Sequence, residues 1–231
     1  MSEVDGLRSL LKEFENIIVL DVETTGIDHK GDEIIELAAL RLERRNGGAE
    51  IAEEFDYFVR LSAGRRLPPE ITDLTGISEE QLETEGVSKT EAAARLADML
   101  ACPTPLVVAY NAQFDLCFLY YLLAREGRAD VLKGIRMLDA LTVYKDRQPY
   151  PHKLCNAVEA YALQTQNTHR AIDDARATVE LMYALEAERD DLPRYINLFG
   201  YNPKYGVSGP KISSICYLPQ PYNARKPLYE T

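Results

Sequence analysis

The stretch Asp21-Val22-Glu23-Thr24-Thr25-Gly26 follows an apolar run, Ile17-Ile18-Val19-Leu20, and the two together indicate how the chain begins to fold. An apolar run of this length that ends in a turn signal predicts a buried β-strand. Residues two apart in a strand share a face, so Asp21 and Glu23 are expected side by side at the end of a sheet. Two carboxylates so close repel each other unless a cation lies between them. The stretch alone is equally typical of an acidic strand end that caps a turn at Thr25-Gly26.

A second polar stretch, Asn111-Ala112-Gln113-Phe114-Asp115, comes directly after the apolar run Leu106-Val107-Val108-Ala109. It opens a helix-like apolar segment that reaches about Ala124. Asp115 is therefore expected in a first helical turn. A carboxylate at that place also commonly stabilises the helix dipole, which is the structural alternative.

The third stretch, His169-Arg170-Ala171-Ile172-Asp173-Asp174, leads into a helix-forming run over residues 175–188. His169 and Asp174 are five residues apart, so a residue just before the helix and one inside its first turns can converge on one ligand. A single histidine before a helix is more often a surface or capping residue. Because neighbours on a helix differ by about 100°, only one of Asp173 and Asp174 can face such a site.

In this order the motifs D-V-E-T-T-G, N-A-x-F-D and H-x-x-x-x-D resemble those of the DnaQ-like 3′→5′ exonucleases, in the branch with four acidic residues and a histidine. The tyrosine branch of that family carries a tyrosine where this chain has Arg170. The resemblance covers about residues 16–188. Three further segments also look like the family: residues 32–37, 69–77 and 153–154. One departure is Tyr110, where many relatives have histidine, and it bears on substrate contacts rather than on chemistry.

The resemblance implies a role for each motif residue. It gives the catalytic centre four metal ligands: Asp21, Glu23, Asp115 and Asp174. Asp21 would bridge two metal ions, and the family spacing selects Asp174 over Asp173, which is expected to face solvent. His169 would take the proton from the attacking water. Substrate contacts are implied for six residues: Thr24, Thr25, Gly26, Leu74, Asn111 and Phe114.

The chemistry of these residue types supports the same centre without the family name. Hydrolysis of a phosphodiester needs neutralised phosphate charge, an activated water and a stabilised leaving oxygen, and two hard cations about 3.5–4 Å apart supply all three. Mg²⁺ and Mn²⁺ prefer oxygen ligands, which four carboxylates provide. Histidine titrates near neutrality and is suited to act as a general base. We therefore expect two divalent cations, Mg²⁺ or Mn²⁺, as cofactors.

Other polar residues near the motifs have a structural interpretation. Glu36 lies in an apolar run and is expected to make a structural hydrogen bond rather than to bind metal, because a buried carboxylate needs a partner. Leu74 could equally pack in the core instead of contacting the substrate. His29 and His152 lie in loop-like contexts and are given no role. The cysteines show no metal-ligand spacing, which argues against zinc: Cys102, Cys117, Cys155 and Cys216.

Composition limits the class of protein. The chain has 231 residues, 46% of them apolar, and a formal net charge of −11, which suits a globular enzyme domain without strong non-specific binding to nucleic acid. Its apolar stretches are too short or interrupted to span a bilayer, and residues 1–15 lack the apolar centre of a signal peptide. We expect a cytoplasmic protein with no membrane attachment.

The order of predicted elements is that of an α/β domain. We expect strands near 17–23, 33–43, 52–60, 105–110 and 134–138, a helix near 88–101, a helix holding Asp115, and further helices to about 188. Ser88 and Glu91 predict a capping box at the start of the 88–101 helix. The resemblance implies a ribonuclease-H-like fold, in which a five-stranded mixed sheet is flanked by helices.

The composition of the chain changes at Pro193. Residues 1–193 hold 36 acidic and 21 basic side chains, whereas residues 194–231 hold one acidic and five basic side chains and six of the fourteen tyrosines. We expect an exonuclease domain over 1–193 and a Tyr/Pro-rich basic C-terminal extension over 194–231. Its tyrosines and cations are suited to hold nucleic acid. Alternatively, the extension wraps its own acidic domain or a second subunit and buries its rings.

The function expected from these patterns is metal-dependent 3′→5′ exonuclease activity on single-stranded DNA, with release of nucleoside 5′-monophosphates. Trimming of RNA ends by the same chemistry is an alternative, because the motifs do not show how a 2′-hydroxyl is treated. A catalytically silent module that binds nucleic acid or protein on the same fold is another alternative. The expected partners are 3′ ends of single strands, DNA before RNA, and a DNA polymerase if the chain proofreads.

Overall fold

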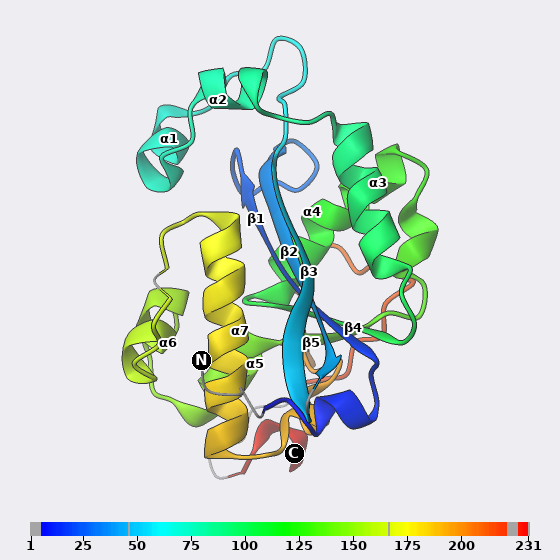
Figure 1. Cartoon of the computed structure of the whole chain (residues 1–231), viewed down its shortest axis with the longest axis vertical. Helices are drawn as coiled ribbons and strands as arrows, with labels where there is room; N and C mark the ends of the chain where they lie inside the picture. Colours follow the sequence, from blue (N-terminus) through cyan, green and yellow to red (C-terminus); the bar gives the residue numbers. More distant parts are fainter. Residues whose placement is uncertain (1–5, 46, 166, 221–225, 231) are drawn as a thin grey trace.

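A computed structural model describes residues 6–45, 47–165, 167–220 and 226–230. Among these residues, five strands form a mixed sheet in the order β3-β2-β1-β4-β5 (Figure 1). Their bounds are β1 Asn16–Thr24, β2 Ile34–Arg45, β3 Gly48–Phe58, β4 Pro105–Ala109 and β5 Arg136–Asp139. Strands β1, β2 and β3 are antiparallel neighbours, whereas β4 and β5 run parallel to β1. The predicted α/β class and five-stranded mixed sheet are confirmed.

Helices flank this sheet, as predicted. They are α1 Pro69–Thr75, α2 Glu79–Thr84, α3 Lys89–Leu100, α4 Ala112–Arg125, α5 Ala140–Arg147, α6 Leu154–Ala160 and α7 Ala171–Glu188. Short 3₁₀ turns cover Leu10–Lys12, Ala129–Leu132, Leu192–Tyr195 and Leu228–Glu230, and a two-stranded hairpin joins β6 Tyr201–Asn202 to β7 Gly206–Val207. No helix in the described part of the chain is long and apolar enough to cross a membrane.

Strand β1 is buried on both faces, and its alternate residues enter different cores. Ile18 packs in the core that includes α3 and α4, whereas Ile17 and Val19 pack in the core that includes α5 and α7. Asp21 and Glu23 continue the odd-numbered series, so both belong to the α7 side of the sheet. The strand thereby carries two carboxylates toward the helix that the third motif begins.

Helix α3 begins where its capping signal predicts. The Ser88 Oγ accepts a hydrogen bond from the Glu91 backbone N–H at 3.1 Å. The complete, reciprocal capping box lies one helix earlier, because Ser78 and Gln81 each bond the other's backbone at the start of α2. Of the capping box predicted at Ser88, the structure shows the hydrogen bond to the serine side chain.

The chain after α7 returns to the sheet and packs against it. Tyr195 and Phe199 have no exposed surface. Asn197 bonds to the edge strand β5, since its backbone N–H donates to Met137 O at 2.7 Å and its side-chain oxygen accepts from Met137 N at 3.1 Å. Residues 194–220 thus contribute to the cores of the sheet. The division of the chain at residue 193 stays a prediction.

Candidate active site

The turn after β1 is fixed by one aspartate. Asp32 accepts from the Thr25 hydroxyl at 3.0 Å and from the Asp28 backbone N–H at 2.9 Å. A Cβ at Gly26 would lie 2.4 Å from the Asp32 carboxylate, so this position excludes a side chain unless Asp32 shifts. The half-buried Glu23 and the buried Thr24, whose hydroxyl donates to Gly26 O at 2.6 Å, are held just before this turn.

Asp115 is positioned by a second aspartate that the sequence did not reveal. Asp139, at the end of β5, accepts from the backbone N–H groups of Asn111 at 2.9 Å and Ala112 at 3.3 Å. These bonds hold Asn111 in a left-handed conformation, with φ of 70°, at the start of α4. Asp115 in the next turn is 2% exposed, and its carboxylate accepts from the backbone N–H of Val22 in β1. The second motif therefore faces the first.

A buried ion pair sets the start of α7. Glu36 in β2 has no exposed surface and accepts from Arg170 Nε at 2.9 Å, Arg170 Nη2 at 2.6 Å and the Ala171 backbone N–H at 2.9 Å. The structural interpretation of Glu36 is confirmed, and its oxygens are occupied by the residues that follow His169. Glu36 thereby fixes the backbone at which the third motif enters the helix.

Replacing Glu36 by alanine should destabilise the protein by about 3 kcal/mol, because a partly buried guanidinium and a helix-start N–H lose their partner together. Urea unfolding at pH 7 measures the change. The matched control is Glu54→Ala, which breaks an exposed pair with Arg176 between β3 and α7. Exposed pairs contribute about 0–1 kcal/mol, so equal losses in the two variants would contradict the anchoring role of Glu36.

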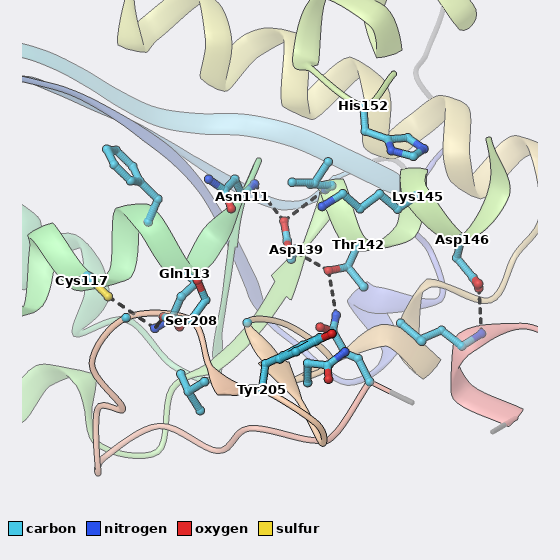
Figure 2. Close-up of a pocket in the computed structure, with 18 of the residues that line it drawn as sticks. Asn111, Gln113, Cys117, Asp139, Thr142, Lys145, Asp146, His152, Tyr205 and Ser208 are labelled. Carbon is cyan, nitrogen blue, oxygen red and sulfur yellow. Dashed lines mark hydrogen bonds between the residues drawn. The ribbon is translucent and has the colours of Figure 1, made fainter. Parts of the chain in front are cut away.

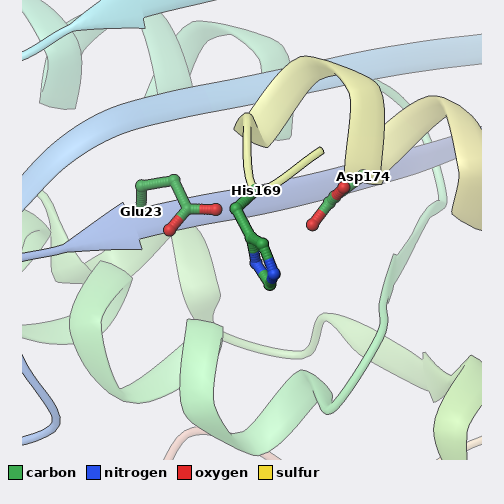
Figure 3. Close-up of side chains that lie close together, drawn as sticks. All are labelled: Glu23, His169 and Asp174. Atoms are coloured by element: carbon green, nitrogen blue, oxygen red, sulfur yellow. The ribbon is translucent and has the colours of Figure 1, made fainter. Parts of the chain in front are cut away.

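Three motif residues converge in space. Ligand atoms of Glu23, His169 and Asp174 all lie within 4.8 Å of one another, and Figure 3 shows the imidazole between the two carboxylates. His169 is exposed and has a φ of 57°, whereas Asp174 is 6% exposed. Asn167 and the Thr168 backbone N–H, from the loop before α7, both donate to the Asp174 carboxylate. The role of Asn167 was not foreseen, because its contact arises from the path of that loop.

The carboxylates raise one another's pKa values. Burial first, and then the charges of Asp115, Asp174 and Glu23, raises the pKa of Asp21 well above its usual range. Burial, followed by Asp174 and Glu36, raises the pKa of Glu23 to about 8. Burial is also the main cause of the raised pKa values of Asp115 and Asp174. The centre thus concentrates negative charge that is unfavourable without a cation.

This donor set fits hard divalent cations. All four carboxylates offer oxygen ligands, which Mg²⁺ and Mn²⁺ prefer over nitrogen or sulfur. Bringing them together is costly unless positive charge compensates them. Arg170 is the cation that lowers the pKa of Glu23, but its guanidinium is engaged by Glu36. The residues that could hold metal are Asp21, Glu23, Asp115 and Asp174, with His169 adjacent.

The remaining predicted residues differ in their exposure and contacts. Asp173 is half-buried and accepts from the Thr168 hydroxyl at 2.7 Å, so it binds the preceding loop and lies outside the Glu23 cluster. The expectation that Asp173 faces solvent holds in part. Leu74, at the end of α1, is 50% exposed, which is unusual for a core leucine. Phe114 packs on Phe118 with ring centroids 5.0 Å apart.

Most of the chain is similar in sequence to known proteins. The family model of the exonucleases (RNase_T) matches residues 18–182. The chain is 31% identical over 207 residues to a DNA polymerase III of PolC type from Latilactobacillus sakei, a match that covers 88% of this chain and 14% of that protein. A PolC-type polymerase of Thermotoga maritima is 31% identical over 166 residues, covering 71% of this chain and 11% of that protein.

Solved structures show the same fold. Exonuclease I of E. coli, solved in complex with a dT13 oligonucleotide, superposes with a TM-score of 0.70 at 20% identity and covers 78% of this chain and 43% of that chain. The chain spans about one seventh or less of the curated polymerases that it matches. The match over residues 18–182 contains all three motifs and confirms the resemblance drawn from them. The chain therefore belongs to the exonuclease family, in its DnaQ-like branch.

Proposed function

We propose that this chain is a divalent-metal-dependent 3′→5′ exonuclease that removes nucleoside 5′-monophosphates from single-stranded DNA. The observation that carries the proposal is the convergence of Glu23, His169 and Asp174, together with the half-buried Asp21, whose pKa the charges of Glu23, Asp115 and Asp174 raise. Each of the three motifs supplies part of this centre from a different element. A silent module on the same fold has no need to keep four mutually repelling carboxylates together.

Four carboxylates would hold the two divalent cations: Asp21, Glu23, Asp115 and Asp174. When bound, such cations neutralise phosphate charge, help to activate water and stabilise the leaving oxygen. The protein contributes the fixed geometry, because β1, α4 and α7 are each anchored by hydrogen bonds outside the centre. Preorganised side chains of this kind do not need to rearrange during the reaction.

His169 is proposed as the general base. It is exposed beside two carboxylates, and it lies one residue before the anchored Arg170. Its imidazole takes the proton of the attacking water as the new P–O bond forms and the bond from phosphorus to the 3′ oxygen of the preceding nucleotide breaks. That 3′ oxygen leaves and takes up a proton from solvent, and the imidazole later returns its own proton to solvent.

Single-stranded DNA is the proposed substrate for two reasons. The curated relatives are named as DNA polymerases, and exonuclease I was solved in complex with a dT13 oligonucleotide. The turn at Thr24, Thr25 and Gly26 directly after Glu23 would offer backbone groups to a terminal nucleotide, and the exposed Leu74 would offer an apolar contact. A DNA polymerase is the proposed partner if the chain proofreads.

Digestion of 5′-labelled strands tests this function. With Mg²⁺ or Mn²⁺ we expect a ladder that shortens from the 3′ end, nucleoside 5′-monophosphates as products, and faster cutting of DNA than of RNA. A strand with a blocked 3′ end is the control and should survive. Internal cleavage, digestion from the 5′ end or a preference for RNA would each contradict part of the proposal.

A further inference from the structure

A hollow of about 1040 Å³ opens between the first turns of α4, helix α5 and the returning C-terminal segment (Figure 2). Small-molecule sites usually measure roughly 300–1,000 Å³, so this one has room for more than one nucleotide. One wall consists of residues 200–209, which include the hairpin β6–β7. None of the four carboxylates of the metal centre lines it, and neither does His169, although Asn111, Gln113 and Phe114 of the second motif do.

Helix α4 connects the hollow to the proposed active site. Gln113 and Cys117 line the hollow and, four residues apart, share one face of the helix. Asp115 lies two residues from each and therefore belongs to the opposite face. Asn111 and Phe114, both predicted substrate contacts, also line the hollow. The two faces of a helix are about 10–12 Å apart, counting its side chains. A nucleic-acid strand whose 3′ end lies beside Asp115 would therefore have to pass around α4 over that distance to reach the hollow.

The C-terminal wall is attached firmly to the rest of the domain. Gln113, 6% exposed, donates from Nε2 to Ser208 O at 2.8 Å and to Pro210 O at 3.2 Å. Gln220 donates to the Thr142 hydroxyl of α5 at 3.0 Å. The wall is therefore held to α4 and to α5, the two helices that form the rest of the hollow.

Large exposed side chains gather at this hollow. Tyr150 is 85% exposed, Tyr205 is 77% exposed and Ile27 is 86% exposed, and all three line it. Such side chains, grouped at one concavity, mark a binding surface. Figure 2 shows Tyr205 on the C-terminal wall across the hollow from Lys145 and His152. Exposed tyrosine rings stack on bases without regard to sequence.

Lys145 is the one lysine or arginine side chain among the described residues that line the hollow, which also include the carboxylates of Asp139 and Asp146. Asp139 is occupied by the start of α4, and Asp146 accepts from the Tyr195 hydroxyl at 2.6 Å and the Leu228 backbone N–H at 2.9 Å. Lys145 is exposed and forms no ion pair with any residue that the structure describes. An uncompensated lysine beside exposed rings suits a phosphate backbone with its bases, even in a chain of net charge −11.

We propose that the hollow holds the nucleotides that precede the scissile bond in the same single strand. Bases stack on Tyr150 and Tyr205, and the backbone follows Lys145. The inference rests on the proposed exonuclease function. A strand is favoured over a free nucleotide or a peptide because Asn111 and Phe114, the proposed contacts of the 3′-terminal nucleotide, also line the hollow.

The test is the affinity of fluorescein-labelled oligothymidylates of two to twelve nucleotides, measured in chelator so that none is cut. We expect the affinity of the wild-type protein to rise with length. Tyr150→Ala and Tyr205→Ala should each weaken binding of the twelve-nucleotide strand roughly 5- to 150-fold, the effect of losing one stacked base. Tyr150→Phe and Tyr205→Phe keep the ring and should keep the affinity. Both tyrosines are exposed, so none of these variants disturbs the core.

Lys145→Ala tests the backbone contact separately. It should reduce the slope of log affinity against log salt by about 0.7, the value for one phosphate contact on a single strand. Lys211→Ala is the matched control, because Lys211 is an exposed lysine of the C-terminal segment that does not line the hollow. Equal slopes in the two variants would overturn the assignment of Lys145.

Oligothymidylate affinity tests the role of the hollow, and digestion of labelled strands tests the exonuclease function, so the two proposals can fail separately. Alanine variants that bind the long strand as tightly as the wild type would overturn the role of the hollow, even where 3′→5′ digestion proceeds. Phenylalanine variants as weak as the alanine variants would overturn the stacking. Length-dependent binding that needs both rings, in a protein that digests nothing, would leave the hollow in place and overturn the exonuclease function.

Discussion

Asp21→Asn, Glu23→Gln, Asp115→Asn and Asp174→Asn should each lower the rate of 3′→5′ digestion roughly 10³-fold or more. Each change removes a charged oxygen ligand from a centre whose cations contribute several kcal/mol to the transition state, and each 1.36 kcal/mol is a factor of ten. Chelation of divalent cations should abolish the activity of the wild type in the same way. Digestion of a labelled strand at saturating Mg²⁺ measures both effects.

Asp173→Asn is the matched control, since Asp173 adjoins Asp174 but bonds to Thr168 outside the cluster. It should keep most of the activity. An inactive Asp173→Asn beside an active Asp174→Asn would show that the third motif has been assigned to the wrong aspartate. Full activity in any of the four variants would remove that residue from the metal centre.

The same carboxylates should destabilise the protein when no metal is present. A carboxyl group with a raised pKa in the folded state binds protons more tightly than in the unfolded state, so its ionisation opposes folding. Glu23, with a pKa of about 8, should therefore lower stability as pH rises from about 4 to about 8. Asp21→Asn should melt at a higher temperature than the wild type at pH 8 in chelator, and Mg²⁺ should raise the melting temperature of the wild type more than that of the variant. A lower melting temperature for the variant would contradict the repulsion.

The sequence was sufficient to predict the parts of the site that depend on local order. Asp21 and Glu23 share a face because strand geometry alternates, and the apolar run before them is long enough to define that strand. Asp115 follows β4 and Asp174 lies in the first turn of α7, as their motifs indicate. Strands β1 and β4 are parallel neighbours, so the first two motifs lie at the same end of the sheet, where both strands finish.

The sequence predicted a structural hydrogen bond for Glu36, but it did not reveal which contacts hold these parts in register. Glu36 meets Arg170 across 134 residues, and Asp139 meets the Asn111 backbone across 28 residues. Neither contact leaves a spacing or period in the chain. The C-terminal segment has no helical period, so its return to α4 through Gln113 and Ser208 depends on tertiary packing. The hollow that this return creates could not be predicted for the same reason.

His169→Ala should slow digestion by roughly 10² to 10⁴, the usual effect of losing a general base, while the Mg²⁺ concentration for half-maximal rate stays nearly unchanged. His169 is exposed, so free imidazole can reach the vacated position and should restore part of the rate. Steady-state rates over a Mg²⁺ titration, with and without imidazole, measure the two effects. Their combination separates proton transfer from a loss of structure, because a misfolded variant responds to neither addition.

The alternative for His169 is metal ligation, since its ring nitrogen lies within 4.8 Å of ligand atoms of Glu23 and Asp174. Carboxylate oxygens suit Mg²⁺ better than imidazole does, and four of them are already at the centre. A ligand role requires His169→Ala to raise the metal concentration needed for half-maximal rate by a large factor. A base role requires the loss to persist at saturating metal. A variant that recovers full activity at high Mg²⁺ would therefore reassign His169 as a ligand and leave the attacking water without a base from this chain.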